Sequence, residues 1–162
     1  MYNNNKNNNR KNFNNQNKNN KKNKNNKKAS YFEQNKDKLN SGQLSPQDIQ
    51  YNTDRIIRDI VYGNIEADVG NYLYNQTIFT TLYNRVLFLY QYNWSIYMAL
   101  SEFIQNHQMN LPPSYLQAQN IIRPKMEAYK ILFDALEAFR LTGNFQLVKN
   151  IPFSLKMYRN CF

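Results

Sequence analysis

The chain has 162 residues and a formal net charge of +10, from 21 Lys and Arg against 11 Asp and Glu. This length is typical of one folded domain with attached segments. A single Cys, Cys161, and a single His, His107, exclude an internal disulfide and the common zinc ligand sets.

Residues 1–28 form a basic arm. They hold fifteen Asn, eight Lys, one Arg and no acid, so they supply +9 of the net charge, while residues 29–162 have 12 Lys and Arg against 11 acids. Such a segment repels itself and has almost no apolar surface to bury, so we expect it to be disordered. An AT-rich genome also accumulates Asn and Lys, but drift would be expected to include some acids.

The arm is therefore the candidate nucleic-acid-binding segment. A flexible cationic tail binds phosphates by releasing counterions, without sequence specificity. The predicted nucleic-acid-binding residues are its nine cations: Lys6, Arg10, Lys11, Lys18, Lys21, Lys22, Lys24, Lys27 and Lys28.

The first folded element is predicted over residues 46–62. Residues 29–44 are a polar linker whose Tyr31-Phe32 pair can dock on the body or on a neighbour. Ser45 then provides a cap, Pro46 suits a first helical turn, and Gly63 is a stop signal.

A long helix is predicted from about residue 70 to residue 108, with a start signal near Asp68. Its middle, residues 78–100, is apolar on most faces and holds one charge, Arg85. We expect a buried central helix of a bundle, because Arg85 and the scattered amides and hydroxyls oppose a membrane span.

Another helix follows the Leu111-Pro112-Pro113 turn, with Ser114 as its cap. A kink or short break is expected at Arg123-Pro124, and Gly143 is placed to end the helix. Residues 144–162 contain Pro152 and an apolar alternation, which predicts an extended tail.

No residue pattern predicts catalysis, and no metal or cofactor is expected. The acids that occur in pairs, Asp54 with Asp59 and Asp134 with Glu137, each have Lys or Arg neighbours, as solvated helix faces do. Cys161 is expected to be an inert residue of the tail.

Aromatic residues indicate an assembling body. The chain has 13 Tyr, 10 Phe and one Trp, and several follow helical spacing (Tyr72, Phe79, Tyr83, Tyr90, Tyr97). A core role explains most of them, but a body this size has more apolar surface than it can bury alone. We therefore expect self-association or a place in a larger assembly.

Three stretches, RDIVYGNI (58–65), NYLYNQTIFTTLYN (71–84) and FRLTGNFQLVKNI (139–151), resemble small helical proteins of crAss-like and related AT-rich tailed bacteriophages. The resemblance implies a structural or auxiliary role in a virion. It transfers no functional residue, because the stretches are helix ends rather than a site.

The sequence predicts an all-α fold: a small helical bundle with a long central helix, a disordered arm (1–28), a polar linker (29–44), a bundle (45–143) and an extended tail (144–162). The predicted function is a non-enzymatic virion protein that assembles with copies of itself or other virion proteins, its arm contacting nucleic acid or an acidic protein surface. The alternative is an architectural or regulatory nucleic-acid-binding protein in the host cytoplasm. A membrane partner is not expected.

Overall fold

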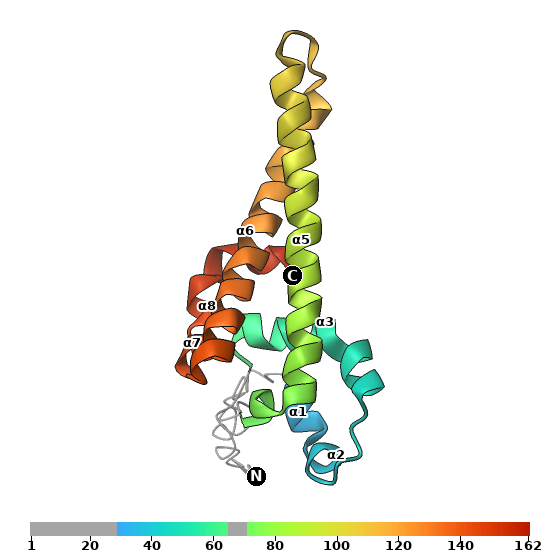
Figure 1. Cartoon of the computed structure of the whole chain (residues 1–162), viewed down its shortest axis with the longest axis vertical. Helices are drawn as coiled ribbons and strands as arrows, with labels where there is room; N and C mark the ends of the chain where they lie inside the picture. The colour runs from blue at the N-terminus through green and yellow to red at the C-terminus, as the bar shows by residue number, and fades with distance from the viewer. Residues whose placement is uncertain (1–28, 65–70) are drawn as a thin grey trace, which may run out of the picture.

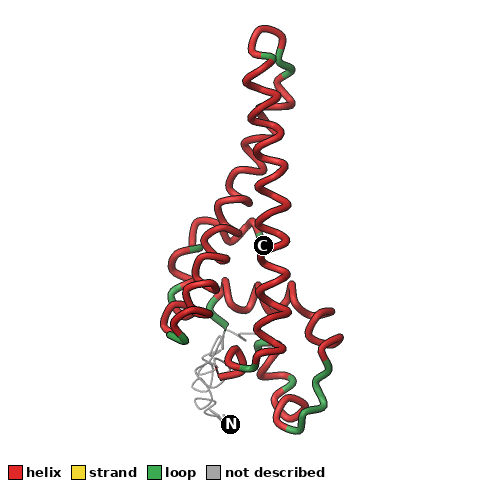
Figure 2. The backbone as a smooth tube through the Cα atoms, in the orientation of Figure 1, coloured by secondary structure: helices red, strands yellow, loops and turns green. Residues whose placement is uncertain are grey.

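The computed structural model describes residues 29–64 and 71–162. In these ranges it is all-α, with no strand, and two long antiparallel helices form its axis (Figures 1 and 2). These are α5 (Gln76–Asn106) and α6 (Pro113–Thr142). The other helices gather around the lower half of this hairpin, and its upper half stands alone as a stalk. The predicted all-α fold with a long central helix is confirmed.

The expected linker forms two short helices at the base, α1 (Tyr31–Gln34) and α2 (Lys36–Asn40). The Ser30 hydroxyl accepts a hydrogen bond from the Glu33 amide at 3.2 Å and so caps α1. Tyr31 and Phe32 are buried in the main core. The pair therefore docks on the body of its own chain and not on a neighbouring molecule.

Helix α3 (Pro46–Tyr62) has the bounds that its signals predict. Ser45 and Asp48 form a reciprocal capping box, and Gly63 ends the helix in the left-handed conformation at φ 71°. The buried face of α3 recurs at helical spacing: Ile49, Thr53, Ile56, Ile57, Ile60 and Val61.

Helix α5 begins at Gln76, after the short 3₁₀ turn η1 (Asn71–Tyr74). The Asn75 side chain accepts hydrogen bonds from the amides of Thr77 and Ile78, and so caps it. The start signal at Asp68 lies outside the described residues. Buried apolar residues of α5 end at Val86, so the helix is central to the core only in its lower part.

Helix α6 follows the 3₁₀ turn η2 (Gln108–Asn110) at the tip of the stalk. Its N-cap is Pro112, and the predicted cap Ser114 lies inside the first turn. The helix continues unbroken through Pro124, where an exposed helix can leave one carbonyl to water. Gly143 ends α6 at φ 67°, as predicted.

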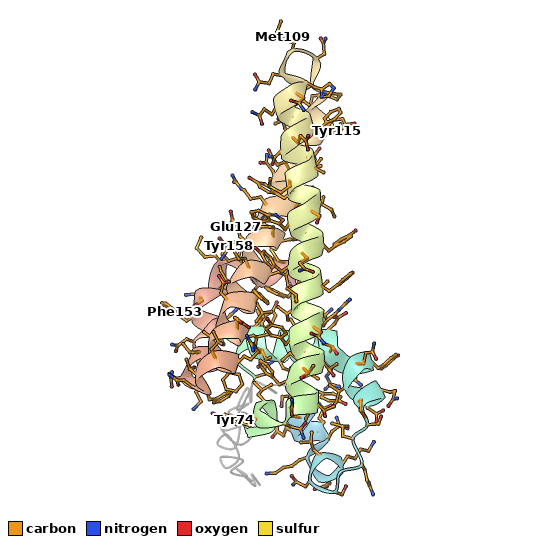
Figure 3. The ribbon with its side chains drawn as sticks, viewed as in Figure 1. Tyr74, Met109, Tyr115, Glu127, Phe153 and Tyr158 are labelled. Atoms are coloured by element: carbon orange, nitrogen blue, oxygen red, sulfur yellow. The ribbon has the colours of Figure 1, made fainter. Side chains whose placement is uncertain are left out.

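The C-terminal segment differs from the extended tail that its alternation predicts. It folds as α7 (Gln146–Lys149), α8 (Ile151–Ser154) and the 3₁₀ helix η3 (Lys156–Cys161), packed on α6 and α3. Pro152 does not prevent this, because it occupies the first turn of α8, where no amide donor is needed. Leu155 is fully buried, while Phe153 is 85% exposed and points outward from α8 (Figure 3).

Candidate assembly surface

The nine predicted nucleic-acid-binding residues, Lys6 to Lys28, lie outside the described residues. Their point of attachment is described: Ala29 precedes α1, at the end of the molecule opposite the stalk tip (Figure 1). The Tyr31 amide donates a 2.7 Å hydrogen bond to the Asp59 carboxylate, which fixes α1 to α3. The arm is therefore joined to a firmly packed base.

The acids that occur in pairs along the sequence are engaged with neighbouring groups. Asp54 bridges to Arg85 at 3.0 Å, between α3 and α5, while Asp59 accepts from the Tyr31 amide. Asp134 pairs with Lys130 and Glu137 with Arg140, each at 2.6 Å along α6. Hydrogen bonds from Arg140 and Tyr83 lower the pKa of Glu137 to about 2, so this carboxyl stays ionised rather than serving as a proton donor.

The remaining candidate groups in the described ranges are potential metal ligands, Cys161 and His107. No cluster of His, Cys, Asp or Glu there could hold a metal ion. Burial raises the pKa of the Cys161 thiol, which disfavours the nucleophilic thiolate. His107 is exposed at the stalk tip, with its Nδ1 2.9 Å from the Phe103 carbonyl oxygen and its ring stacked on Phe103.

A polar groove lies between α3 and α5. It measures about 510 Å³ and includes the Asp54–Arg85 pair in its lining. The remaining lining side chains are amides and hydroxyls, from Gln50, Thr53, Thr81 and Asn84. Ligand sites are usually lined mainly by apolar side chains, and the lining of this groove is polar instead.

The stalk is the distinctive surface of the molecule. We define it as residues 91–125, all of them described. Asn93 is its single buried residue, and Met109 marks its tip (Figure 3). Its large exposed apolar side chains, with exposed fractions between 42% and 96%, are Tyr92, Trp94, Met98, Met109, Leu116 and Ile121.

Charge is nearly absent from the same region. Between Arg85 and Arg123 the sequence has one formally charged side chain, Glu102. Exposed apolar side chains with little charge among them suit a protein or membrane contact in soluble folds. Among the described residues no helix is long and apolar enough to cross a membrane.

A chain of aromatic contacts leads from the base into the stalk. Ring centroids lie 5.4 Å apart for Phe139–Phe79 and for Tyr83–Phe133, with Phe79–Tyr83 between them at 5.8 Å. Tyr90 stacks on Phe133 at 5.6 Å and meets Trp94 at 6.2 Å. Phe79, Tyr83 and Tyr90, which were predicted to be core residues, thus pack together. The last ring in this series of contacts, Trp94, is 42% exposed.

The exposed stalk is the surface feature that the sequence pattern did not locate. Apolar periodicity predicted a buried helix over its whole length, whereas the helices α1 to α3 and α7 to η3 cover only the lower half. The signal available in the sequence was the charge gap from residue 86 to residue 122 together with the polar tip QNHQMN. No protein-family model, no curated protein and no solved structure matches this chain.

Proposed function

We propose that this chain is a non-enzymatic structural protein whose helical body assembles with other protein subunits and whose basic arm contacts nucleic acid. One observation supports it most: the positive charge and the exposed apolar surface belong to different parts of the molecule. The arm carries +9, while the stalk exposes apolar side chains with almost no charge. Two separate surfaces of different chemistry suit a protein that joins a polyanion to a protein assembly.

A virion is the assembly we favour. The stretches 58–65, 71–84 and 139–151 resemble helical proteins of AT-rich tailed phages, and packaged nucleic acid is the polyanion that such proteins face. The proposed location is therefore the virion, where the partners are copies of this chain or other virion proteins.

The charge on the described helices argues against a sequence-reading regulator. Such a protein presents a basic helix to the groove. Helix α3 carries two Arg and three Asp, α5 one Arg and one Glu, and α6 four basic against three acidic side chains. None of these helices has an excess of more than one positive charge.

The arm is tested by the salt dependence of nucleic-acid binding. Full-length protein is titrated with a labelled duplex and a labelled single strand over a series of NaCl concentrations, with fluorescence anisotropy as the measurement. Each phosphate contact contributes about −0.9 to the slope of log K against log salt on duplex DNA, so nine contacts give about −8. A variant with Gln at all nine arm cations should lose nearly all of this slope.

A control variant neutralises five cations of the body instead. Gln at Lys36, Lys38, Lys125, Lys149 and Lys156 should leave the slope close to that of the original chain. If the neutral-arm variant binds duplex with an unchanged slope, the arm is not the nucleic-acid contact. Displacement of the duplex by polyglutamate at equal charge would instead favour an acidic protein surface as the partner of the arm.

A further inference from the structure

Beside the buried residues Ile78, Leu82 and Val86, α5 has a second row of apolar side chains that continues into the stalk. Leu87, Tyr90, Trp94 and Met98 follow the three-and-four spacing of a helix that packs on a partner. We call these four residues the Trp94 row. Tyr90 stacks on Phe133 of α6, so the row begins beside α6 and continues along α5 through Trp94 and Met98. A helix with two adjacent apolar rows is built for two neighbours.

Helix α6 meets the Trp94 row at Tyr90, and α3 lies on another side of α5. Arg85 contacts α3 through Asp54, and pocket-lining Leu89 also faces α3 beside Ile57. With about 3.6 residues per turn, Trp94 lies on the side of α5 opposite Arg85. The Trp94 row is therefore open: Trp94 is 42% and Met98 48% exposed.

The chemistry of this row fits a second copy of the same chain. Charged residues at the centre of an interface are costly, and they are depleted from interface cores. Here Glu102 is the only formal charge between Arg85 and Arg123. It is exposed and lies one turn beyond Met98, so each copy brings a single charge to the edge of the contact. The polar tip, with Asn106, Gln108 and Asn110, opposes insertion into lipid, where these amides would lose water.

We propose that two copies pair antiparallel through the Trp94 row, so that their stalks form a four-helix bundle with a two-fold axis between Trp94 and Met98. This inference rests on the assembly half of the proposed function. In a two-fold interface the same patch is used twice. Trp94 of each copy then packs on the partner's Met98, and sulfur–aromatic contacts of this kind are favourable.

The available area suits a specific dimer. Residues 87–105 of α5 span about 27 Å at about 1.5 Å per residue, and a hairpin of two helices is about 20 Å wide. The face therefore measures about 500 Å² on each copy before side-chain relief is counted, or about 1,000 Å² for the pair, which is the lower bound for a specific interface.

The arms determine the antiparallel direction. Each copy carries +9 on residues 1–28, which join the body at Ala29, at the end opposite the stalk tip. Parallel stalks would place both arms at the same end, where their repulsion opposes pairing. Antiparallel stalks place them at opposite ends, well beyond the screening length of about 8 Å at physiological salt.

Self-association is measured on the full-length chain by sedimentation across a dilution series from high micromolar to nanomolar. Trp94 is the only Trp in the chain, so its emission reports on the proposed contact directly. We expect a dimer that dissociates on dilution, with a red shift of the emission at the same midpoint. A monomer at all concentrations would overturn the proposal.

Matched substitutions test the position of the contact. Met98→Glu places a charge against the partner's Trp94 and should weaken the dimer at least about tenfold. Met157→Glu makes the same change at a residue that is 92% exposed on η3, and should leave dimerisation unchanged. Tyr92→Glu alters another flank of α5, so loss of the dimer there, with Met98→Glu unaffected, would refute the Trp94 row.

The direction is tested by one spin-label distance. With Cys161→Ser removing the native thiol, Thr80→Cys places a label on exposed α5 near the base. Thr80 lies sixteen residues from the proposed axis, so antiparallel copies separate the two labels by about 50 Å at about 1.5 Å per residue. A separation near the width of a bundle, about 20 Å, would show parallel stalks and overturn the arrangement.

The two proposals fail in different assays. If the chain stays monomeric while its arm binds nucleic acid with a steep salt dependence, the dimer proposal is refuted and the proposed function of the arm is supported. A stable antiparallel dimer whose arm shows no salt-dependent binding does the reverse.

Discussion

Gly63 ends α3 and also lies against Pro152 of the C-terminal segment. Its replacement by Ala, compared with the same change at Gly143, separates the contribution of the backbone conformation from that of the packing. The residue has φ 71°, a left-handed conformation that costs a side-chain-bearing residue about 1–2 kcal/mol. A Cβ at this position would also lie 3.2 Å from Pro152 Cγ and 3.4 Å from Pro152 Cβ, in α8. Gly63→Ala is therefore expected to lower the free energy of unfolding in two ways, through backbone strain at residue 63 and through crowding between α3 and α8.

Gly143 provides the matched control, because it ends α6 at φ 67° and a Cβ there would meet nothing within 4 Å. Gly143→Ala should cost only the conformational part, about 1–2 kcal/mol. Gly63→Ala should cost about 1 kcal/mol more, the lower end of the range for overpacking a filled site.

Urea unfolding followed by circular dichroism measures both free energies of unfolding, and equal m-values make the comparison valid. The double variant Gly63→Ala with Pro152→Ala should recover part of the extra cost, as coupled neighbours do. Equal losses at Gly63 and Gly143, with no coupling to Pro152, would show that α8 does not rest on the end of α3.

Three further outcomes are expected. Phe32→Ala should lower the free energy of unfolding by about 3–5 kcal/mol, since this ring is 2% exposed in the core; a loss below 1 kcal/mol in urea unfolding would mean that α1 is not part of the folded body. The pKa of Glu137 is lowered to about 2 by Arg140 and Tyr83, so its contribution is present above the unfolded value near 4.5 and is lost as pH falls toward 2. Glu137→Gln should reduce the pH dependence of unfolding in that window, and an unchanged profile would exclude this carboxyl. Because burial raises the pKa of the Cys161 thiol, Ellman's reagent should react with it more slowly at pH 8 than with an exposed thiol, and equal rates would contradict the packing of η3.

Local signals predicted the ends of helices because those signals act over a few residues. Ser45, Asp48 and Gly63 bound α3 as their capping chemistry requires, and Gly143 ends α6 by the same rule. The C-terminal segment was harder, because alternating apolar residues suit both a strand and a run of short helical turns. Packing on α6 decided between them: Leu155 is inside, and Phe153 and Met157 are outside.

The sequence by itself determined the all-α class, both ends of α3, the C-terminal end of α6 and the separation of charge between arm and body, since each depends on residue type and spacing alone. It did not determine which apolar faces are covered. Apolar periodicity is a property of one helix, whereas burial depends on whether another element packs against that part of the helix. The C-terminal helices meet α6 as high as Glu127, where Tyr158 donates a 3.0 Å hydrogen bond to its carboxylate (Figure 3). Above that contact the hairpin has no further cover among the described residues, so only the tertiary structure shows that Trp94 and Met98 form a surface rather than a core.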